Sequence, residues 1–378
     1  MAGIYIHIPF CKKACNYCDF HFSTQLNQKT DLIQALTKEI EQRASYLQEM
    51  PVDTIYFGGG TPSLLEVGEL ETLLNALKKN FTWSEMPEVT LEANPDDLKD
   101  VAKWTALRRL GFNRLSIGIQ SFFDDHLVWM NRAHSASEAQ LAVELARQAG
   151  FENLTIDLIY GIPGMTEEQW KENIQKAIDL KVQHISAYCL TVEERTALHK
   201  QVREGRVKEA SDEQVEWQVN TLCSMLEQAQ FERYEISNFA QSGYESKHNS
   251  SYWKGDWYLG IGPSAHSFNG NSRNWNVSNN AVYVQAVQKN EGYSDFEEID
   301  ETTAYNEFVM TRLRTRWGID LNEVKQRFLI DIESDFEEEL GYLQEDEEAV
   351  LANGTLTLTH KGMFFADAIA ASLFLEKE

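Results

Sequence analysis

The sequence predicts an α/β fold in which parallel strands alternate with helices, followed by a smaller and mainly helical C-terminal domain. Two observations indicate this class: short β-branched or apolar runs recur over residues 4–190, and amphipathic helical patterns separate them. Strands that alternate with helices are typical of βαβ units and of a parallel sheet. Six such units are too few to close an eight-stranded barrel, so an open sheet or a partial barrel fits better.

The individual elements follow from the same pattern. Six runs are predicted strands: residues 4–9, 54–57, 88–92, 114–119, 154–160 and 184–190. Four stretches between them are predicted helices: residues 68–81, 101–110, 135–149 and 166–180. Gly111 and Gly150 stand where helix C-caps belong, and Thr166 provides an N-cap for the last of these helices.

The character of the sequence changes near residue 211. A helix over 212–228 leads to a strand-like run at 233–236 and then to a loop rich in aromatic residues, Asn, Gly and Ser from 238 to 280. Helices over 301–328, a short strand at 355–360 and a final amphipathic helix follow. We therefore expect three parts: a core over residues 1–235, an aromatic-rich connecting segment over 236–290, and a C-terminal accessory domain over 291–378.

The charge of the chain excludes some classes of partner. It has 34 basic and 59 acidic residues among 378, a formal net charge of −25, and residues 291–350 alone carry 19 acidic and 5 basic side chains. A chain this acidic has no general electrostatic attraction to nucleic acid or to anionic lipid. The amino terminus shows no signal-peptide pattern and no apolar run is long enough to span a bilayer, so we expect a cytoplasmic protein without a transmembrane segment.

Three of the five cysteines form a cluster, Cys11-x3-Cys15-x2-Cys18. Iron–sulfur clusters are held by thiolates, and three of them can surround one side of a cubane and leave one iron without a protein ligand. The alternative is structural zinc, with His21 or His7 as the fourth ligand. Zinc sites usually pair Cys-x2-Cys units or combine Cys with His, so the spacing favours iron–sulfur over zinc.

Polar residues gather at the carboxyl ends of the predicted strands, where α/β folds bind ligands. They are the cysteine loop after the first strand, the glycines 58–60 with Thr61 after the second, Glu92, Gln120 and Asp157. A triple glycine is often only a turn, and an acid at a strand end is often a helix cap. Together they nevertheless predict one shared site.

The cysteine spacing, with Tyr17 just before Cys18, resembles the signature of the radical S-adenosylmethionine superfamily. Within it, several segments are similar to the oxygen-independent coproporphyrinogen dehydrogenase group: residues 4–11, 56–62, 116–122, 156–163, 313–321 and 356–362. The resemblance implies a partial (β/α)6 barrel with an accessory domain. It also implies a 4Fe–4S cluster whose open iron is chelated by S-adenosylmethionine.

The resemblance assigns roles to individual residues. The cluster ligands would be Cys11, Cys15 and Cys18. The contacts to S-adenosylmethionine would come from Tyr5, Tyr17, the backbone of Gly59, Gly60 and Thr61, the acceptor Glu92, and a polar rim of Gln120, Arg132 and Asp157.

Two departures separate the chain from the dehydrogenases, in which another cysteine follows the third ligand after one residue and an N-terminal arm precedes the first strand. Here Asp19 and Phe20 follow Cys18, and three residues precede Ile4. Residues 248–253 instead match the His-Asn-x2-Tyr-Trp motif of a paralogous group, the HemW heme chaperones. That match implies that His248 binds heme, with His266 as a second candidate.

Three hypotheses follow. The first is a heme chaperone that binds heme and passes it to acceptor proteins, respiratory proteins being one candidate class; dehydrogenase activity is then not expected. The second is an oxygen-independent coproporphyrinogen III dehydrogenase. The third is a zinc-stabilised α/β protein without radical chemistry. For His248 itself, the alternative to heme binding is a hydrogen-bonded loop histidine.

Overall fold

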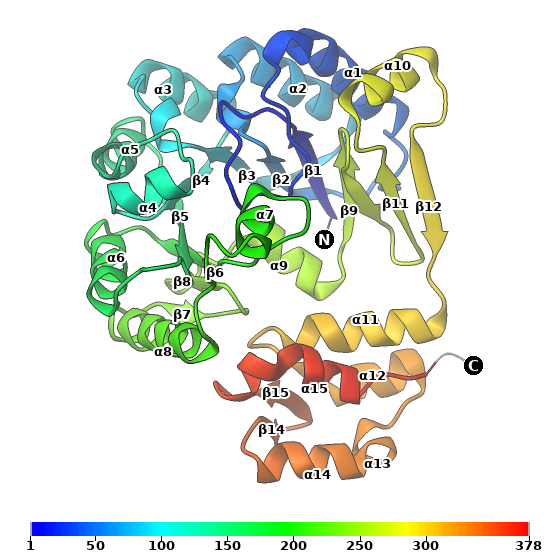
Figure 1. Cartoon of the computed structure of the whole chain (residues 1–378). Coiled ribbons are helices and arrows are strands. Elements are labelled where there is room, and N and C mark those ends of the chain that lie inside the picture. Colours follow the sequence, from blue (N-terminus) through cyan, green and yellow to red (C-terminus); the bar gives the residue numbers. More distant parts are fainter. Residues whose placement is uncertain (1, 377–378) are drawn as a thin grey trace.

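Six parallel strands in sequence order form the centre of the computed structural model, which describes residues 2–376. They are β1 (Ala2–Ile8), β2 (Val52–Gly59), β3 (Trp83–Ala93), β4 (Arg114–Gln120), β5 (Asn153–Tyr160) and β6 (His184–Cys189). Each strand pairs in parallel with the next. The strands follow one another in a single direction, and the sheet forms a partial barrel with helices outside (Figure 1). The predicted fold class is confirmed.

Helices connect these strands. They are α1 (Lys29–Gln42), α2 (Val67–Asn80), α3 (Val101–Leu110), α4 (Asp124–Trp129), α5 (Ala136–Gln148) and α6 (Glu167–Asp179). The four predicted helices are confirmed to within two residues at each end. Ser135 and Thr166 cap α5 and α6, because their side chains accept hydrogen bonds from the backbone N–H groups of Glu138 and Gln169. After β6 come α7 (Ala197–Arg203) and the predicted helix α8 (Asp212–Gln228).

The stretch from 238 to 280, expected as a loop, is ordered, so that expectation was wrong. It and its flanks form β7 (Glu232–Arg233), β8 (Asn238–Ala240), α9 (Lys247–Lys254), β9 (Trp257–Ile261), β10 (His266–Phe268), β11 (Ser272–Asn276), α10 (Asn280–Lys289) and β12 (Ser294–Glu298). Strand β9 pairs in parallel with β1, and β10–β12 continue antiparallel beyond it. Strands β8 and β7 extend the opposite edge beside β6.

Helix α9 lies close to the amino-terminal ends of β1 and β2, and Figure 1 shows it between the barrel and α11. The approach depends on Gly3 of β1. A Cβ at this position would lie 2.9 Å from Thr54 Oγ1 and 3.3 Å from the His248 ring. A glycine at residue 3 therefore lets the α9 imidazole pack against the strands.

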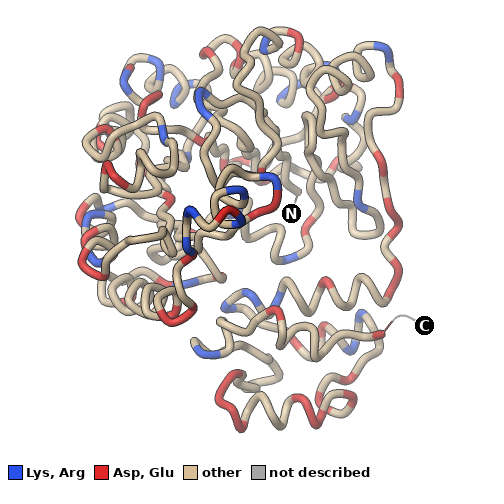
Figure 2. The backbone as a smooth tube through the Cα atoms, in the orientation of Figure 1, with Lys and Arg blue, Asp and Glu red and all other residues tan. Residues whose placement is uncertain are grey.

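The C-terminal part has its own apolar core. Its elements are α11 (Glu301–Leu313), β13 (Ile319–Asp320), α12 (Leu321–Phe328), α13 (Ile332–Asp335), α14 (Glu337–Glu345), β14 (Ala349–Ala352), β15 (Thr355–Leu358) and α15 (Ala366–Ser372). The three short strands pair antiparallel. Acidic residues concentrate along β12 and around α13 and α14 (Figure 2). No helix within residues 2–376 combines the length and the hydropathy that a bilayer span requires.

A buried carboxylate attaches the added strands to the first helix. Glu39 of α1 is 0% exposed, and it accepts hydrogen bonds from the backbone N–H of Gly262 (2.8 Å), from Asn276 Nδ2 (2.8 Å) and from the Tyr283 hydroxyl. Burial raises the pKa of this carboxyl. Three donors from residues 262–283 thus converge on one side chain of α1.

Replacing Glu39 with Ala should lower the free energy of unfolding by about 3–5 kcal/mol, because buried polar partners would lose their acceptor. Glu41→Ala is the matched control: Glu41 is exposed and forms an exposed ion pair with Lys79 across 3.2 Å, so its loss should cost below about 1 kcal/mol. Urea unfolding followed by circular dichroism measures both. Equal losses in the two variants would contradict this role of Glu39.

Candidate functional site

The cysteine loop leaves the carboxyl end of β1 and is fixed by backbone hydrogen bonds. The Cys11 N–H donates to the Ser23 carbonyl (3.0 Å), and the Ser23 N–H donates back to Pro9 (2.7 Å). Further along, the Asn16 N–H donates to the Met130 carbonyl (3.2 Å). The loop is therefore positioned both by its own bridge at Ser23 and by Met130, the residue that follows α4.

The thiols lie in a polar network contributed by several strand ends. The Thr61 hydroxyl lies 3.4 Å from Cys11 Sγ, and Arg132 Nη1 lies 3.5 Å from Cys15 Sγ. Asn94 joins the two, because its amide donates to Thr61 Oγ1 (3.1 Å) and its Oδ1 accepts from Arg132 Nη2 (2.6 Å). Asn94 was not predicted as a site residue from the sequence; its place directly after β3, before a proline, is the signal that could have identified it.

The chemistry of these donors fits an iron–sulfur cluster. Cys11, Cys15 and Cys18 are all half-buried, and sulfur is the ligand that such clusters use. Burial raises the pKa of the Cys18 thiol to about 12 and also raises that of Cys11, so iron binding must release protons. Across residues 2–376, no three His, Cys, Asp or Glu side chains form a ready-made metal-binding group. The three thiols share a loop but do not yet converge on one point.

Close packing explains the glycines after β2. Gly59 has φ +104°, and a Cβ there would lie 2.4 Å from the His7 ring. A Cβ on Gly60 would lie 2.7 Å from the backbone N and O of Phe10, immediately before the first cysteine. Glycine is therefore required for the ends of β1 and β2 to meet. Their predicted contact with S-adenosylmethionine stays a prediction.

Two carboxyls lie inside the partial barrel. Glu92 accepts hydrogen bonds from the Tyr56 hydroxyl (2.8 Å) and from the Gly59 N–H (3.1 Å). Burial, with a contribution from the nearby Asp157, raises the pKa of Glu92 to about 7. Burial likewise raises the pKa of Asp157 to about 6. Near neutral pH these two carboxyls are therefore partly protonated, and a bound cationic ligand would favour their ionised form.

The other residues predicted to contact S-adenosylmethionine lie in two places: Gln120, Arg132 and Tyr17 lie near one another, and Tyr5 lies apart from them. Gln120, the last residue of β4, and Arg132 meet over Gly118: a Cβ on that glycine would lie 3.0 Å from Gln120 Nε2 and 3.1 Å from Arg132 Nη2. Tyr17 is half-buried near Arg132, and desolvation raises the pKa of its hydroxyl. Tyr5 lies farther along β1, where its hydroxyl is 3.1 Å from His7 Nδ1. The structure thus gathers the cysteine loop, Thr61, Gln120 and Arg132 most closely.

His248 is 1% exposed, and both of its ring nitrogens have partners. Nδ1 lies 2.8 Å from Thr54 Oγ1, and Nε2 lies 2.9 Å from the Tyr252 hydroxyl. The ring also stacks on Tyr56 at 5.0 Å, and burial lowers its pKa to about 3, so the imidazole is neutral. Heme ligation by His248 stays a prediction. Ligation through Nε2 would require the hydrogen bond between His248 Nε2 and the Tyr252 hydroxyl to break.

Comparisons with known proteins agree with this architecture. The family model described as the Radical SAM superfamily matches residues 5–177, and that of the HemN C-terminal domain matches residues 299–365. Among solved structures, the fold is similar to Escherichia coli coproporphyrinogen III oxidase (HemN), described as a radical SAM enzyme. The TM-score is 0.85 and the identity 23%, covering 99% of this chain and 90% of that one. These matches define a radical SAM fold with a HemN-type C-terminal part.

Curated relatives define the family more narrowly. The chain is 32% identical over 372 residues to the heme chaperone HemW of Bacillus subtilis (strain 168), covering 98% of both chains. It is 34% identical over 388 residues to the heme chaperone HemW of Mycobacterium tuberculosis (strain H37Rv), covering 98% of this chain and 94% of the relative. The chain therefore belongs to the HemW family of the radical SAM superfamily.

Replacing Gly60 with Ala should push the backbone of Phe10 and expose the cysteine loop, at a cost of about 1–3 kcal/mol in the free energy of unfolding. Gly68→Ala is the control, because a Cβ there meets no atom within 4 Å. Thermal unfolding and the rate of thiol labelling at Cys11 measure the effect. If Gly60→Ala labels no faster than Gly68→Ala, the close packing does not position the loop.

Proposed function

We propose that this protein is a heme chaperone: it binds heme and transfers it to acceptor proteins, and it carries a 4Fe–4S cluster and S-adenosylmethionine. The observation that supports this most is the similarity, along nearly the whole chain, to proteins named heme chaperones. The alternative dehydrogenase activity has weaker support: the solved dehydrogenase-type structure is 23% identical to this chain, and the shared HemN C-terminal domain covers only residues 299–365. We also propose a cytoplasmic location, because reduced thiols suited to a cluster persist in a reducing compartment.

The proposed cluster ligands are Cys11, Cys15 and Cys18. Support comes from their common loop at the end of β1 and from the Thr61 and Arg132 contacts to two of the sulfurs. The Arg132 guanidinium therefore places a cation directly beside one of the proposed ligands. When bound, the cluster and S-adenosylmethionine would supply one-electron chemistry.

The proposed S-adenosylmethionine site lies between the cysteine loop and Glu92. Glu92 would bind the ammonium or a ribose hydroxyl of the ligand, while Tyr56 and the Gly59 N–H hold the carboxyl in place. Gln120 and Arg132, which meet over Gly118, would close the polar rim. These residues bind and orient the ligand, and burial excludes water around them.

The cluster assignment predicts that replacing all three loop cysteines with Ser abolishes iron–sulfur absorption after anaerobic incubation with iron and sulfide. The matched control replaces Cys189 and Cys223, the other two cysteines, and should retain the full absorption. Iron and sulfide content, measured alongside the spectrum, separates a cluster from zinc. A full cluster in the triple variant would refute the assignment.

The raised pKa of Glu92 predicts that affinity for S-adenosylmethionine depends on pH. Because the carboxyl is partly protonated in the free protein and the cationic ligand needs the carboxylate, binding releases a proton. Affinity should therefore rise about eight-fold from pH 6 to pH 7.5, the change in the ionised fraction for a pKa of about 7. Calorimetry on Glu92→Gln should show weaker and pH-independent binding. The same pH dependence in that variant would remove Glu92 from the site.

If His248 binds the heme iron, substitutions at His248 and at its hydrogen-bond partner Tyr252 should change heme affinity in opposite directions. His248→Ala should shift the heme spectrum and weaken heme retention, because the proposed iron ligand is lost. Tyr252→Phe removes the hydroxyl from Nε2, so heme affinity should rise about five-fold, the equivalent of one hydrogen bond. Absorbance titration with heme measures both. If Tyr252→Phe loses affinity as His248→Ala does, imidazole ligation through Nε2 is wrong.

A further inference from the structure

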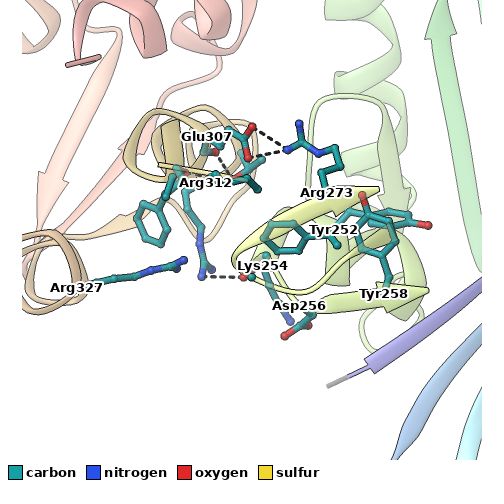
Figure 3. Close-up of a pocket in the computed structure, with 15 residues that line it drawn as sticks. Tyr252, Lys254, Asp256, Tyr258, Arg273, Glu307, Arg312 and Arg327 are labelled. Carbon is teal, nitrogen blue, oxygen red and sulfur yellow. Dashed lines mark hydrogen bonds and ion pairs between the residues drawn. The ribbon is translucent and has the colours of Figure 1, made fainter. Parts of the chain in front are cut away.

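A cavity of about 350 Å³ lies between α9 with β9–β11 and helices α11 and α12 of the C-terminal part (Figure 3). Its walls combine two kinds of side chain. Aromatic rings come from Tyr252, Tyr258, Phe268 and Phe308, and cationic groups come from Lys254, Arg273, Arg312 and Arg327. Flat apolar walls with cations on the rim are complementary to a planar ligand that carries carboxylates.

The aromatic walls lie next to the buried imidazole. Tyr252 packs edge-on against Tyr258 at 4.7 Å between ring centroids, and Tyr258 stacks with Phe268 at 6.1 Å. The Tyr252 hydroxyl is bonded to His248 Nε2. One side chain therefore separates the cavity from a neutral imidazole that could bind a metal.

The cations are not all neutralised by the protein. Glu307 holds Arg273 with two contacts of 2.8 Å, so the Arg273 charge already has a partner. Arg312 and Arg327 both place their guanidinium groups over Phe308, at 5.0 and 5.6 Å from the ring centroid.

Arg312 has one carboxylate, Glu323, at 3.4 Å. Within residues 2–376, Arg327 forms no ion pair with a carboxylate. Arg327 is exposed, so its charge is open to an anion that enters the cavity from solvent. Both arginines lie in a segment, residues 291–350, that has 19 acidic and only 5 basic residues.

A second cavity of about 510 Å³ offers an internal comparison, because Tyr252 lines it as well. Its basic residue is Arg314, which is bonded to Asp367, and Glu235 adds another carboxyl. A ligand with two carboxylates would meet net negative charge there. Charge therefore favours the cavity between α9 and α11.

We propose that this cavity binds the heme of the proposed function, with Arg312 and Arg327 receiving the propionates and the macrocycle lying against Tyr252, Tyr258 and Phe268. The inference rests on that function and adds the site and its recognition chemistry. Its volume is at the lower end of the range for small-molecule sites, so the macrocycle is enclosed only in part. Partial enclosure suits a ligand that must leave again.

Heme titration of the full-length protein tests the site, with heme and heme dimethyl ester as paired probes. Arg327→Gln should weaken heme binding about ten-fold, because one charge-assisted contact to a propionate is lost. Arg327→Lys should restore part of it. The ester, which lacks the carboxylate charges, should bind the unmodified protein and Arg327→Gln equally. Arg314→Gln, in the second cavity, is the matched control and should bind heme as the unmodified protein does.

The possible results distinguish failure of the proposed heme site from failure of the proposed heme-binding function. If the unmodified protein binds heme and neither Arg327→Gln nor Arg312→Gln changes the affinity, the proposed site is wrong while heme binding stands. If Arg314→Gln is the variant that weakens binding, heme occupies the second cavity and the proposal is overturned. If the unmodified protein binds neither heme nor the ester, the proposed function fails and this inference fails with it.

Discussion

The pairing of β1 on both of its edges is the constraint on which the rest of the structure depends. Strand β2 lies on one edge and β9 on the other, both parallel to β1. At its carboxyl end β1 leads into the cysteine loop, and at its amino end Gly3 admits His248 of α9. One seven-residue strand therefore sets the spacing between the proposed cluster and the proposed heme-binding helix.

A chain of buried contacts runs between these two ends. The His248 ring stacks on Tyr56, the Tyr56 hydroxyl donates to Glu92, and Glu92 accepts from the Gly59 N–H. Burial keeps the imidazole neutral, which is the form that binds a metal, and it raises the pKa of the Glu92 carboxyl, so a cationic ligand there would release a proton. The contacts give the two proposed sites a shared wall of strands β1 and β2. They also make Tyr56 a side chain that both sites need.

The sequence predicts the parts of this molecule whose signal is local. Apolar runs locate the six strands, and the spacing of Cys11, Cys15 and Cys18 locates the loop. The segment 238–280 was predicted to be a loop because its short strands have little periodicity of their own. Strand β9 is ordered by pairing with β1, more than 250 positions away in the chain, and β8 by pairing with β6. The burial of His248 was not predictable either, since one of its partners, Thr54, comes from a distant strand. The cavity was not predictable for the same reason, because lining residues such as Arg273 and Arg327 are far apart in the sequence and are brought together only by the fold.

The measurement that tests the account most directly is heme titration of the anaerobically reconstituted protein, run beside an assay for protoporphyrinogen with coproporphyrinogen, S-adenosylmethionine and a reductant. The account predicts saturable heme binding by protein that also carries an iron–sulfur cluster, with no protoporphyrinogen formed. Robust conversion of coproporphyrinogen, or a fully reconstituted protein that binds no heme, would contradict it.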